Sequence, residues 1–269
     1  MEYKRVLTVQ DLSCLGQCSG AVALPVLSAF GLETCLLPTA LLSTHTAFGR
    51  PYVCQLTESI TPIREHWQRE GIRFDAILTG YLGKPEDVEP VCELLDTLLA
   101  PGGMVLVDPA MADGGRFYKG LDGAYAEKMR DLCGRADVLL PNRTEASFLT
   151  GIADDGSESA ARAMLLALPQ KKAVLTGAVS GEGQTGFAVK EGETVRFYRH
   201  EKLPGTYHGT GDLFAACLTG FLLSGKSLLE SAVAASDFTA RAIALTAQTD
   251  TRSYGLKFEP LLWQLGKQD

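Results

Sequence analysis

Short apolar segments alternate with longer amphipathic segments along the first two-thirds of the chain. The short segments are rich in Leu and β-branched residues, which is typical of strands buried on both faces. The predicted strands are Val6–Gln10, Thr34–Pro38, Ala76–Thr79, Met104–Val107, Val138–Leu140 and Ala173–Thr176. The predicted helices between them are Ala21–Phe30, Thr61–Glu70, Val88–Leu99, Ala124–Leu132 and Ala160–Leu168. This alternation predicts an α/β fold with a mainly parallel central sheet and helices on both faces.

The last third of the chain has a different pattern, which predicts a β-hairpin followed by two helices. These elements are Phe187–Lys190 with Val195–Arg199, then Leu213–Leu223 and Leu228–Ala247. Gly192 lies in the hairpin turn and Gly225 separates the two helices. The chain has no internal repeat, low-complexity tract or Pro/Ser-rich linker. We therefore expect residues 1–269 to form a single domain.

Composition and charge narrow the functional classes. The chain is 46% hydrophobic and 21% charged, which suits a protein with a sizeable core. Its net charge is −7 and no basic stripe is present, so we expect no nucleic-acid partner. No signal peptide precedes the first strand, and no uncharged apolar run approaches the roughly 18 residues of a membrane span. These features predict a cytoplasmic protein with no membrane partner.

The seven cysteines are scattered through apolar segments. Cys14 and Cys18 are close in sequence, but no second cysteine pair or nearby histidine completes a zinc-binding set. We expect reduced, mostly buried thiols, with a disulfide or metal role as the alternative.

Two glycine motifs resemble phosphate-binding loops but have the wrong context. The segment Gly220–Ser227 matches GxxxxGK[ST], yet it follows an apolar helix rather than a strand, and Gly225 with Lys226 has the character of a helix end. The segment Gly181–Gly186 matches GxGxxG, but a strand follows it, so no helix N-terminus is available for a pyrophosphate. Neither segment is predicted to bind phosphate.

A third glycine segment has the right context. Gly209-Thr210-Gly211-Asp212 leads directly into a predicted helix. Converging backbone N–H groups and the positive end of the helix together suit an anion hole for phosphate oxygens. Capping of the helix by Asp212 is an equally acceptable reading of this segment alone, and both roles are compatible.

Polar residues at the carboxyl ends of four predicted strands favour the phosphate-binding reading. In open α/β sheets, ligands bind beyond these strand ends. The segments concerned are Gly80-Tyr81, Asp108–Asp113, Pro141–Glu145 and Thr176-Gly177. They supply an aromatic surface, carboxylates for hydrated Mg²⁺ and donors to phosphate, which ATP-dependent transfer requires. Any single one of them could be an ordinary helix cap, but four together with the glycine loop favour a site.

With these motifs, the sequence resembles the pyridoxal/pyridoxamine kinase branch of the ribokinase-like superfamily along nearly its whole length. The segments that carry the resemblance are Leu42–Thr46, Thr79–Gly83, Asp108–Asp113, Leu140–Glu145 and Gly209–Phe214. Their order and spacing both fit. The chain is similar to members without the separate β-lid domain of the sugar kinases, and the family implies a homodimer.

The resemblance implies a role for each site residue. Asp212 would accept the proton of the substrate 5′-hydroxyl, and Gly209, Thr210 and Gly211 would form the anion hole. The remaining implied roles are Mg²⁺ organisation by Asp108, Asp113 and Glu145, nucleotide phosphate contacts by Asn142 and Thr176, and the pyridine pocket formed by Tyr81, Thr46 and His45.

Two positions qualify these implied roles. A helix N-terminus favours the carboxylate form, so we expect the pKa of Asp212 to stay near its usual value. Phosphoryl transfer releases the hydroxyl proton late, and an aligned weak base suffices. Asp11 occupies the place where family members commonly have a ring-binding serine. It either faces the substrate ring, where it would favour the cationic amine of pyridoxamine, or caps a turn.

The function predicted from the sequence is ATP- and Mg²⁺-dependent phosphorylation of the 5′-hydroxymethyl group of a B6 vitamer. Hydroxymethylpyrimidine kinase activity is an alternative on the same fold. A third alternative is a catalytically silent sensor of a vitamer or nucleotide, although a pure binding protein needs no base. The sequence leaves a K⁺ requirement open.

Overall fold

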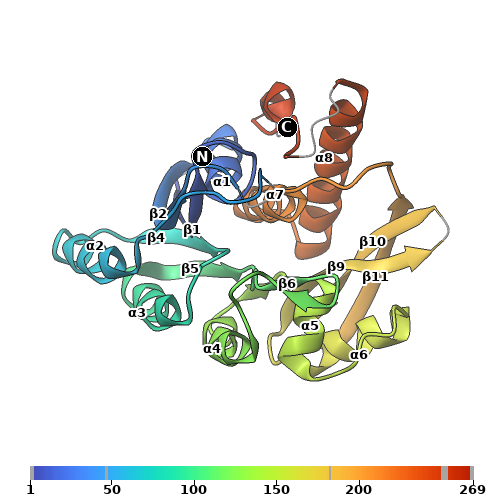
Figure 1. The fold of residues 1–269 in the computed structure, drawn as a ribbon, viewed down its shortest axis with the longest axis horizontal. Helices are drawn as coiled ribbons and strands as arrows, with labels where there is room; N and C mark the ends of the chain where they lie inside the picture. The colour runs from blue at the N-terminus through green and yellow to red at the C-terminus, as the bar shows by residue number, and fades with distance from the viewer. Residues whose placement is uncertain (1–2, 46–47, 182, 250–253, 267–269) are drawn as a thin grey trace.

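The computed structural model describes residues 3–45, 48–181, 183–249 and 254–266. Within these ranges one sheet of nine strands dominates the fold. Its strands are β1 (Arg5–Ser13), β2 (Glu33–Leu42), β3 (Val53–Gln55), β4 (Phe74–Thr79), β5 (Leu99–Val107), β8 (Val138–Leu139), β9 (Lys172–Gly181), β10 (Gln184–Glu191) and β11 (Thr194–Glu201). They lie in the order β11-β10-β9-β8-β5-β4-β1-β2-β3 (Figure 1).

The six central strands of this sheet, from β9 to β2, are parallel to one another. β3 at one edge and the β10–β11 hairpin at the other are antiparallel. The predictions of a mainly parallel sheet and of a hairpin after β9 are therefore confirmed. A separate two-stranded ribbon, β6 (Ala112–Asp113) with β7 (Arg116–Phe117), was not predicted and follows β5.

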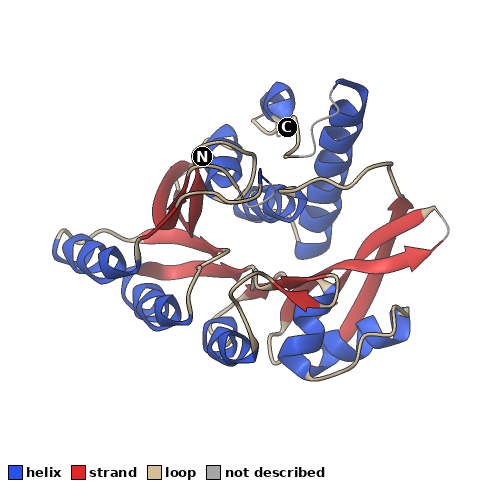
Figure 2. Ribbon diagram, viewed as in Figure 1, coloured by secondary structure: helices blue, strands red, loops and turns tan. Residues whose placement is uncertain are grey.

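Helices cover both faces of the sheet, as the sequence predicts (Figure 2). One face carries α1 (Gly20–Ala29), α7 (Thr210–Leu223) and α8 (Leu228–Thr249). The other carries α2 (Thr57–Arg69), α3 (Val88–Leu98), α4 (Gly123–Cys133), α5 (Arg143–Thr150) and α6 (Glu158–Ala167). A 3-10 turn, η2 (Pro85–Asp87), precedes α3. A second 3-10 turn, η3 (Glu259–Gln264), is the last element of the described chain.

The two rejected glycine motifs lie where the sequence predicts. Gly220 is inside α7, and Gly225 follows its last turn with φ +93°, so this segment ends a helix. Gly181 ends β9, and β10 runs antiparallel to it. α8 begins at Leu228, directly after the first segment, but that segment starts inside α7 instead of following a strand.

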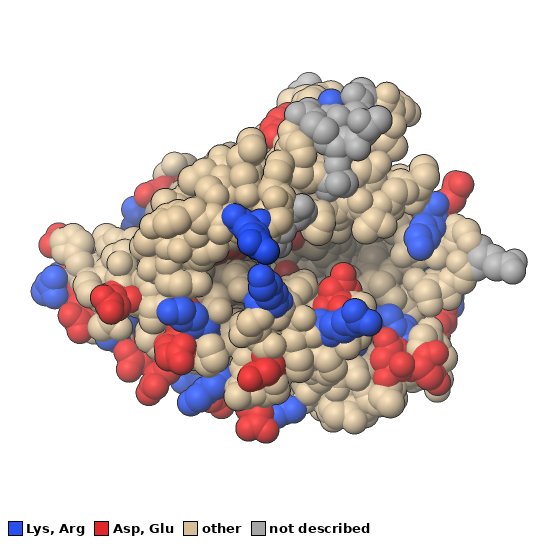
Figure 3. Space-filling model, viewed as in Figure 1, with Lys and Arg blue, Asp and Glu red and all other residues tan. Residues whose placement is uncertain are grey.

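The surface carries charges of both signs, and Figure 3 shows Lys and Arg interspersed with Asp and Glu around a central hollow. Among the described residues, no helix combines the length and apolar character of a membrane span. All seven cysteines are free, but only three are buried: Cys92, Cys133 and Cys217. The expectation of mostly buried thiols was wrong, because Cys14 is exposed and the other three are half-buried in loops or on the outer strands.

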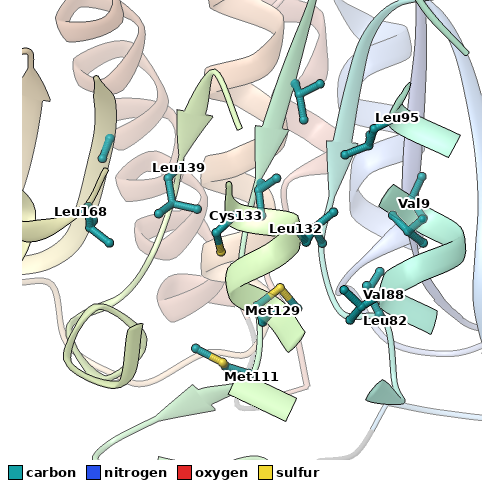
Figure 4. Packing of buried hydrophobic residues seen from close by; sticks show 14 of the residues in the cluster. Val9, Leu82, Val88, Leu95, Met111, Met129, Leu132, Cys133, Leu139 and Leu168 are labelled. Carbon is teal, nitrogen blue, oxygen red and sulfur yellow. The ribbon is translucent and has the colours of Figure 1, made fainter. Parts of the chain in front are cut away.

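Alternation along the central strands explains the two-sided packing. Leu7 and Val9 face one core with Ile77, whereas Val6 faces the other core with Leu78. Figure 4 shows the first core, in which Met129 and Leu132 of α4 lie with Leu139 of β8. Since both faces are buried, the strands are held in register and their carboxyl ends meet at one edge.

Candidate active site

A cavity of about 920 Å³ opens at the carboxyl edge of the sheet, at the hollow seen in Figure 3. Eight of the predicted site residues line it: Asp108, Asp113, Asn142, Glu145, Thr176, Thr210, Gly211 and Asp212. These residues come from the segment that follows β5, including β6, from the middle of β9, and from the starts of α5 and α7. The structure therefore brings together the residues predicted for nucleotide, metal and phosphoryl transfer.

The residues predicted for the substrate ring lie beside this cavity rather than in its lining. The charge of Asp212 raises the pKa of Asp11, and the charge of Asp11 raises the pKa of Tyr81, so the three are electrostatic neighbours. The His45 ring lies 5.2 Å from the ring of His208, and its Nε2 is 2.6 Å from the carbonyl oxygen of Tyr254. Thr46 lies outside the described residues.

The start of α7 is left without a side-chain cap. Gly209 is the N-cap residue, with φ +79°, and no side chain accepts a hydrogen bond from the first turn. A Cβ at this position would collide with the carbonyl oxygen of Gln17, so the close approach of the two loops also requires glycine. Thr210 and Gly211 follow at the cavity wall. Their backbone N–H groups and the positive helix end can bind phosphate oxygens.

Asp212 lies in the first turn of α7, where burial raises its pKa. Interaction with the backbone N–H of Ser19 lowers the pKa, but by less than burial raises it. The expectation that the pKa would stay near its usual value was therefore wrong. Desolvation of the carboxylate outweighs the helix end, and the raised pKa makes Asp212 a better proton acceptor than the sequence indicated.

The start of α5 carries a capping box. The side chain of Asn142 accepts from the backbone N–H of Glu145 at 3.0 Å, and Glu145 Oε2 accepts from the N–H of Asn142 at 2.8 Å. Oε1 of Glu145 also accepts from the N–H of Met111 at 3.1 Å. The Asn142 amide donates to the carbonyl oxygen of Ala112 at 2.7 Å. This capping box therefore holds the loop after β5 against α5.

The carboxylates at the cavity fit a hydrated magnesium ion. Burial raises the pKa of Asp108, and the charges of Glu145 and Asp212 raise it further. In the described part of the chain, no group of three or more His, Cys, Asp or Glu side chains forms a direct metal cage. Mg²⁺ usually keeps several waters and binds through one or two carboxylates and phosphates. Asp108 therefore suits direct contact, and Glu145, whose oxygens already accept backbone bonds, suits contact through water.

Asp11 lies within β1 rather than in a turn, and it is buried. The pairing of β1 with β2 shifts register between Gln10 and Leu12, so a bulge is centred on Asp11. Bulges redirect a side chain out of the regular alternation of a strand. Burial raises the pKa of Asp11 to about 6. These observations disfavour the turn-capping reading of Asp11.

Three residues of the site were missed by the sequence reasoning. Tyr118 and Lys202 line the cavity, and the charges of Glu145 and Asp108 help raise the pKa of Tyr118. Ser19 lowers the pKa of Asp11 through its hydroxyl and the pKa of Asp212 through its backbone N–H. Tyr118 follows the segment Asp108–Asp113 closely enough to have been a candidate, whereas no sequence signal marks Ser19.

Comparison with known proteins identifies the family. The phosphomethylpyrimidine kinase family matches residues 31–256. A pyridoxine/pyridoxal/pyridoxamine kinase from Bordetella avium (strain 197N) is 30% identical over 259 residues, covering 91% of this chain and 86% of that protein. The chain belongs to the pyridoxal kinase family. The resemblance seen in the sequence is thereby confirmed.

Solved structures of the family have the same fold. Pyridoxal kinase from Lactobacillus plantarum is 36% identical, with a TM-score of 0.88 over 97% of this chain and 96% of that one. A protein from Bacteroides thetaiotaomicron VPI-5482, named as a phosphomethylpyrimidine kinase and crystallised with pyridoxal, is 30% identical with a TM-score of 0.93. That match covers 100% of this chain and 97% of the other. The α/β, ribokinase-like fold is therefore confirmed.

Proposed function

We propose that the protein phosphorylates the 5′-hydroxymethyl group of a B6 vitamer with ATP, with Asp212 as the proton acceptor. The observation that carries this proposal is the start of α7. Asp212 lies there beside uncapped N–H groups and faces the carboxylates of Asp108 and Glu145 across one cavity. Phosphate-binding groups, a base and metal-binding groups thus share a single solvent-accessible space. Family membership supports a kinase activity on a B6 vitamer.

The reaction follows from this arrangement. The vitamer hydroxyl oxygen forms a bond to the γ-phosphorus of ATP, the bond from that phosphorus to the ADP oxygen breaks, and the hydroxyl proton goes to Asp212. The products are the phosphate ester and ADP. The N–H groups of Thr210 and Gly211 hold the transferring phosphoryl oxygens, which stabilises their charge in the transition state. Mg²⁺ held by Asp108, with Asp113 and Glu145 acting through water, would neutralise phosphate charge.

The nucleotide phosphates fit the part of the cavity near Asn142 and Thr176. Thr176 lies next to Asn142 through an isolated parallel bridge between β9 and the α5 cap. Both ends of the Asn142 amide already form hydrogen bonds within the protein. Asn142 would therefore support ATP binding indirectly, by holding this side of the cavity in place. Thr176 has a hydroxyl 3.5 Å from the carbonyl oxygen of Pro141 and can reorient to donate to phosphate.

Asp11 provides a basis for preference among the vitamers. At neutral pH its carboxylate is largely ionised, since its pKa is about 6. It is an electrostatic neighbour of both Tyr81 and Asp212. An ionised acid there favours the cationic aminomethyl group of pyridoxamine. We propose pyridoxamine as a preferred substrate. Asp11→Asn should reduce the ratio of kcat/KM for pyridoxamine to that for pyridoxal by about tenfold.

Hydroxymethylpyrimidine is the second candidate substrate, because the matching family carries the name of the phosphomethylpyrimidine kinases. A coupled assay of ADP release with pyridoxal, pyridoxamine, pyridoxine and hydroxymethylpyrimidine separates the candidates. Turnover of a B6 vitamer supports the proposal, and turnover of the pyrimidine alone supports the second candidate. Measurable nucleotide binding without any turnover would favour the silent sensor.

Three further features stay predictions. They are a homodimer, a cytoplasmic location and the single-domain reading of residues 1–269. Sedimentation velocity would test the homodimer, and ADP release measured in Na⁺ and in K⁺ buffers would resolve the open monovalent-ion requirement.

A further inference from the structure

Ser19 has a backbone conformation that is unfavourable for its residue type. Its φ is +47° and its ψ is −129°, and it is the one non-glycine residue with positive φ in the described part of the chain. Residues with a Cβ rarely adopt this region, which favours glycine. Strain of this kind persists at functional sites where the surrounding structure fixes it.

The Ser19 hydroxyl is not used for the role that serine usually has at this position. Ser19 is the N-cap residue of α1, where a serine side chain typically accepts a bond from the first turn of the helix. No such bond is present. Instead, the hydroxyl lowers the pKa of the Asp11 carboxyl, and the backbone N–H lowers the pKa of the Asp212 carboxyl. Ser19 is buried, so water does not compete freely for these contacts.

Close contacts on both sides hold the Ser19 segment in place. A Cβ at Gly209 would collide with the carbonyl oxygen of Gln17, so the α7 loop packs directly on the backbone before Ser19. A Cβ at Gly20 would lie 3.0 Å from the carbonyl oxygen of Asp11, so β1 packs directly on the backbone after it. The segment is therefore wedged between the two elements that carry the two carboxylates.

We propose that Ser19 is a positioning residue that links the base to the substrate-recognising carboxylate, its N–H orienting Asp212 and its hydroxyl orienting Asp11. This inference rests on the function proposed above. This double role explains the unfavourable backbone conformation of Ser19, because that conformation directs both the N–H and the hydroxyl of the residue toward the site. The hydroxyl contact acts on substrate binding through Asp11, whereas the N–H contact acts on the base and is present with any residue other than proline.

The test is a pair of variants, Ser19→Ala and Ser19→Gly, each in the wild-type and the Asp11→Asn background. Both variants remove the hydroxyl and keep the N–H. We expect each to raise KM for the preferred vitamer about tenfold while kcat stays within about threefold, since a hydrogen bond to a charged group is lost. In the Asp11→Asn background the same changes should leave KM within about twofold, because the hydroxyl then has no carboxylate to orient.

Thermal unfolding separates this role from a merely structural one. Ser19→Gly should melt about 2 °C or more above Ser19→Ala, because only glycine relieves the backbone, while the two variants share the same KM defect. A Ser19→Ala KM equal to that of the wild type would overturn the proposal. So would a defect that adds in full to that of Asp11→Asn, or one that lowers kcat instead. If the wild type shows no turnover, the proposed function itself is wrong. That outcome is distinguishable from failure of the Ser19 proposal, because it is measured on the wild type alone.

Discussion

Helices α5 and α7 both begin at the same cavity, and each carries an acid as its third residue, yet the two acids are used differently. Glu145 folds back to the N–H of its own N-cap residue, Asn142, which in turn caps Glu145. Asp212 makes no such return, and its N-cap residue, Gly209, has no side chain to cap the first turn. The start of α5 is capped by its own side chains, whereas the N–H groups at the start of α7 are available to a ligand.

The difference shows how one local motif can serve stability or chemistry. A complete cap satisfies the first N–H groups of a helix and fixes the neighbouring loop, so it leaves little for an anion. An open cap leaves those N–H groups available and exposes the acid to the cavity. Changes at Asp212 should therefore affect activity most, and changes at Glu145 should affect stability most.

Replacement of the α7 acid should give the largest effect. Asp212→Asn removes the proposed proton acceptor, and we expect kcat to fall about 10²–10⁴-fold. Stability should not fall, because burial disfavours the charge that the substitution removes. ADP release at saturating substrates and thermal unfolding measure the two effects. Asp131→Asn, on the exposed surface of α4, is the control. A loss of kcat below about threefold would show that Asp212 is not the base.

The open cap itself can be broken at Gly209. In Gly209→Ala the new Cβ meets the Gln17 carbonyl oxygen and displaces the N–H groups that follow, so we expect kcat/KM to fall about 10²–10³-fold. Gly225→Ala is a matched control at the other end of α7, because Gly225 also has positive φ but has open space around it. Both variants should lose stability in urea unfolding, and Gly209→Ala should lose more because only its Cβ meets a backbone atom. Equal activity losses would mean that backbone strain, not the cap geometry, explains the effect.

The pH dependence of stability tests the burial of Asp11. Its pKa rises from 3.8 to about 6 in the folded protein, so the folded state holds the proton more tightly than the unfolded state. The resulting stabilisation is complete below pH 3.8 and is lost as pH rises to about 6. We expect the wild type to lose about 3 kcal/mol more than Asp11→Asn across this range in urea unfolding. Parallel pH profiles for the two proteins would contradict the assigned burial.

Disruption of the capping box at the start of α5 should give the smallest effect of the four predictions. Glu145→Gln keeps the volume but leaves one oxygen to replace two, so a buried N–H of Met111 or Asn142 loses its acceptor. We expect a loss of about 1–3 kcal/mol in the free energy of unfolding. Glu127→Gln, exposed on α4, should change it by less than about 0.5 kcal/mol. A Glu145→Gln protein of wild-type stability would remove the contrast between the two helix starts.

The fold was predictable because its information is local. Every central strand has a short apolar run, and the glycine break at Gly225 marks the end of α7 in the sequence as it does in the structure. The weaker elements were not found. β3 and the β6–β7 ribbon are too short to have a period of their own. Helix α5 was not predicted either, although an ordinary helix cap was one reading of the segment Pro141–Glu145.

The candidate site was predictable in part. The residues that line the cavity follow strands or start helices, so a rule about strand ends locates them. The pKa of Asp212 was not predictable, because it depends on burial in the folded chain, which no local pattern encodes. The positive φ of Ser19 and the bulge at Asp11 arise from packing between β1, α1 and α7, and no local pattern encodes them.

The contact between Ser19 and Asp212 also has a consequence for biosynthesis. The two residues lie near opposite ends of the chain, on the helix after the first strand and on the helix after the last hairpin. A ribosome-bound chain that lacks α7 therefore has Asp108, Glu145 and Asp11 but lacks Asp212 and the helix start before it. The proposed activity then has to appear late and in one step, when the emerging α7 docks against α1.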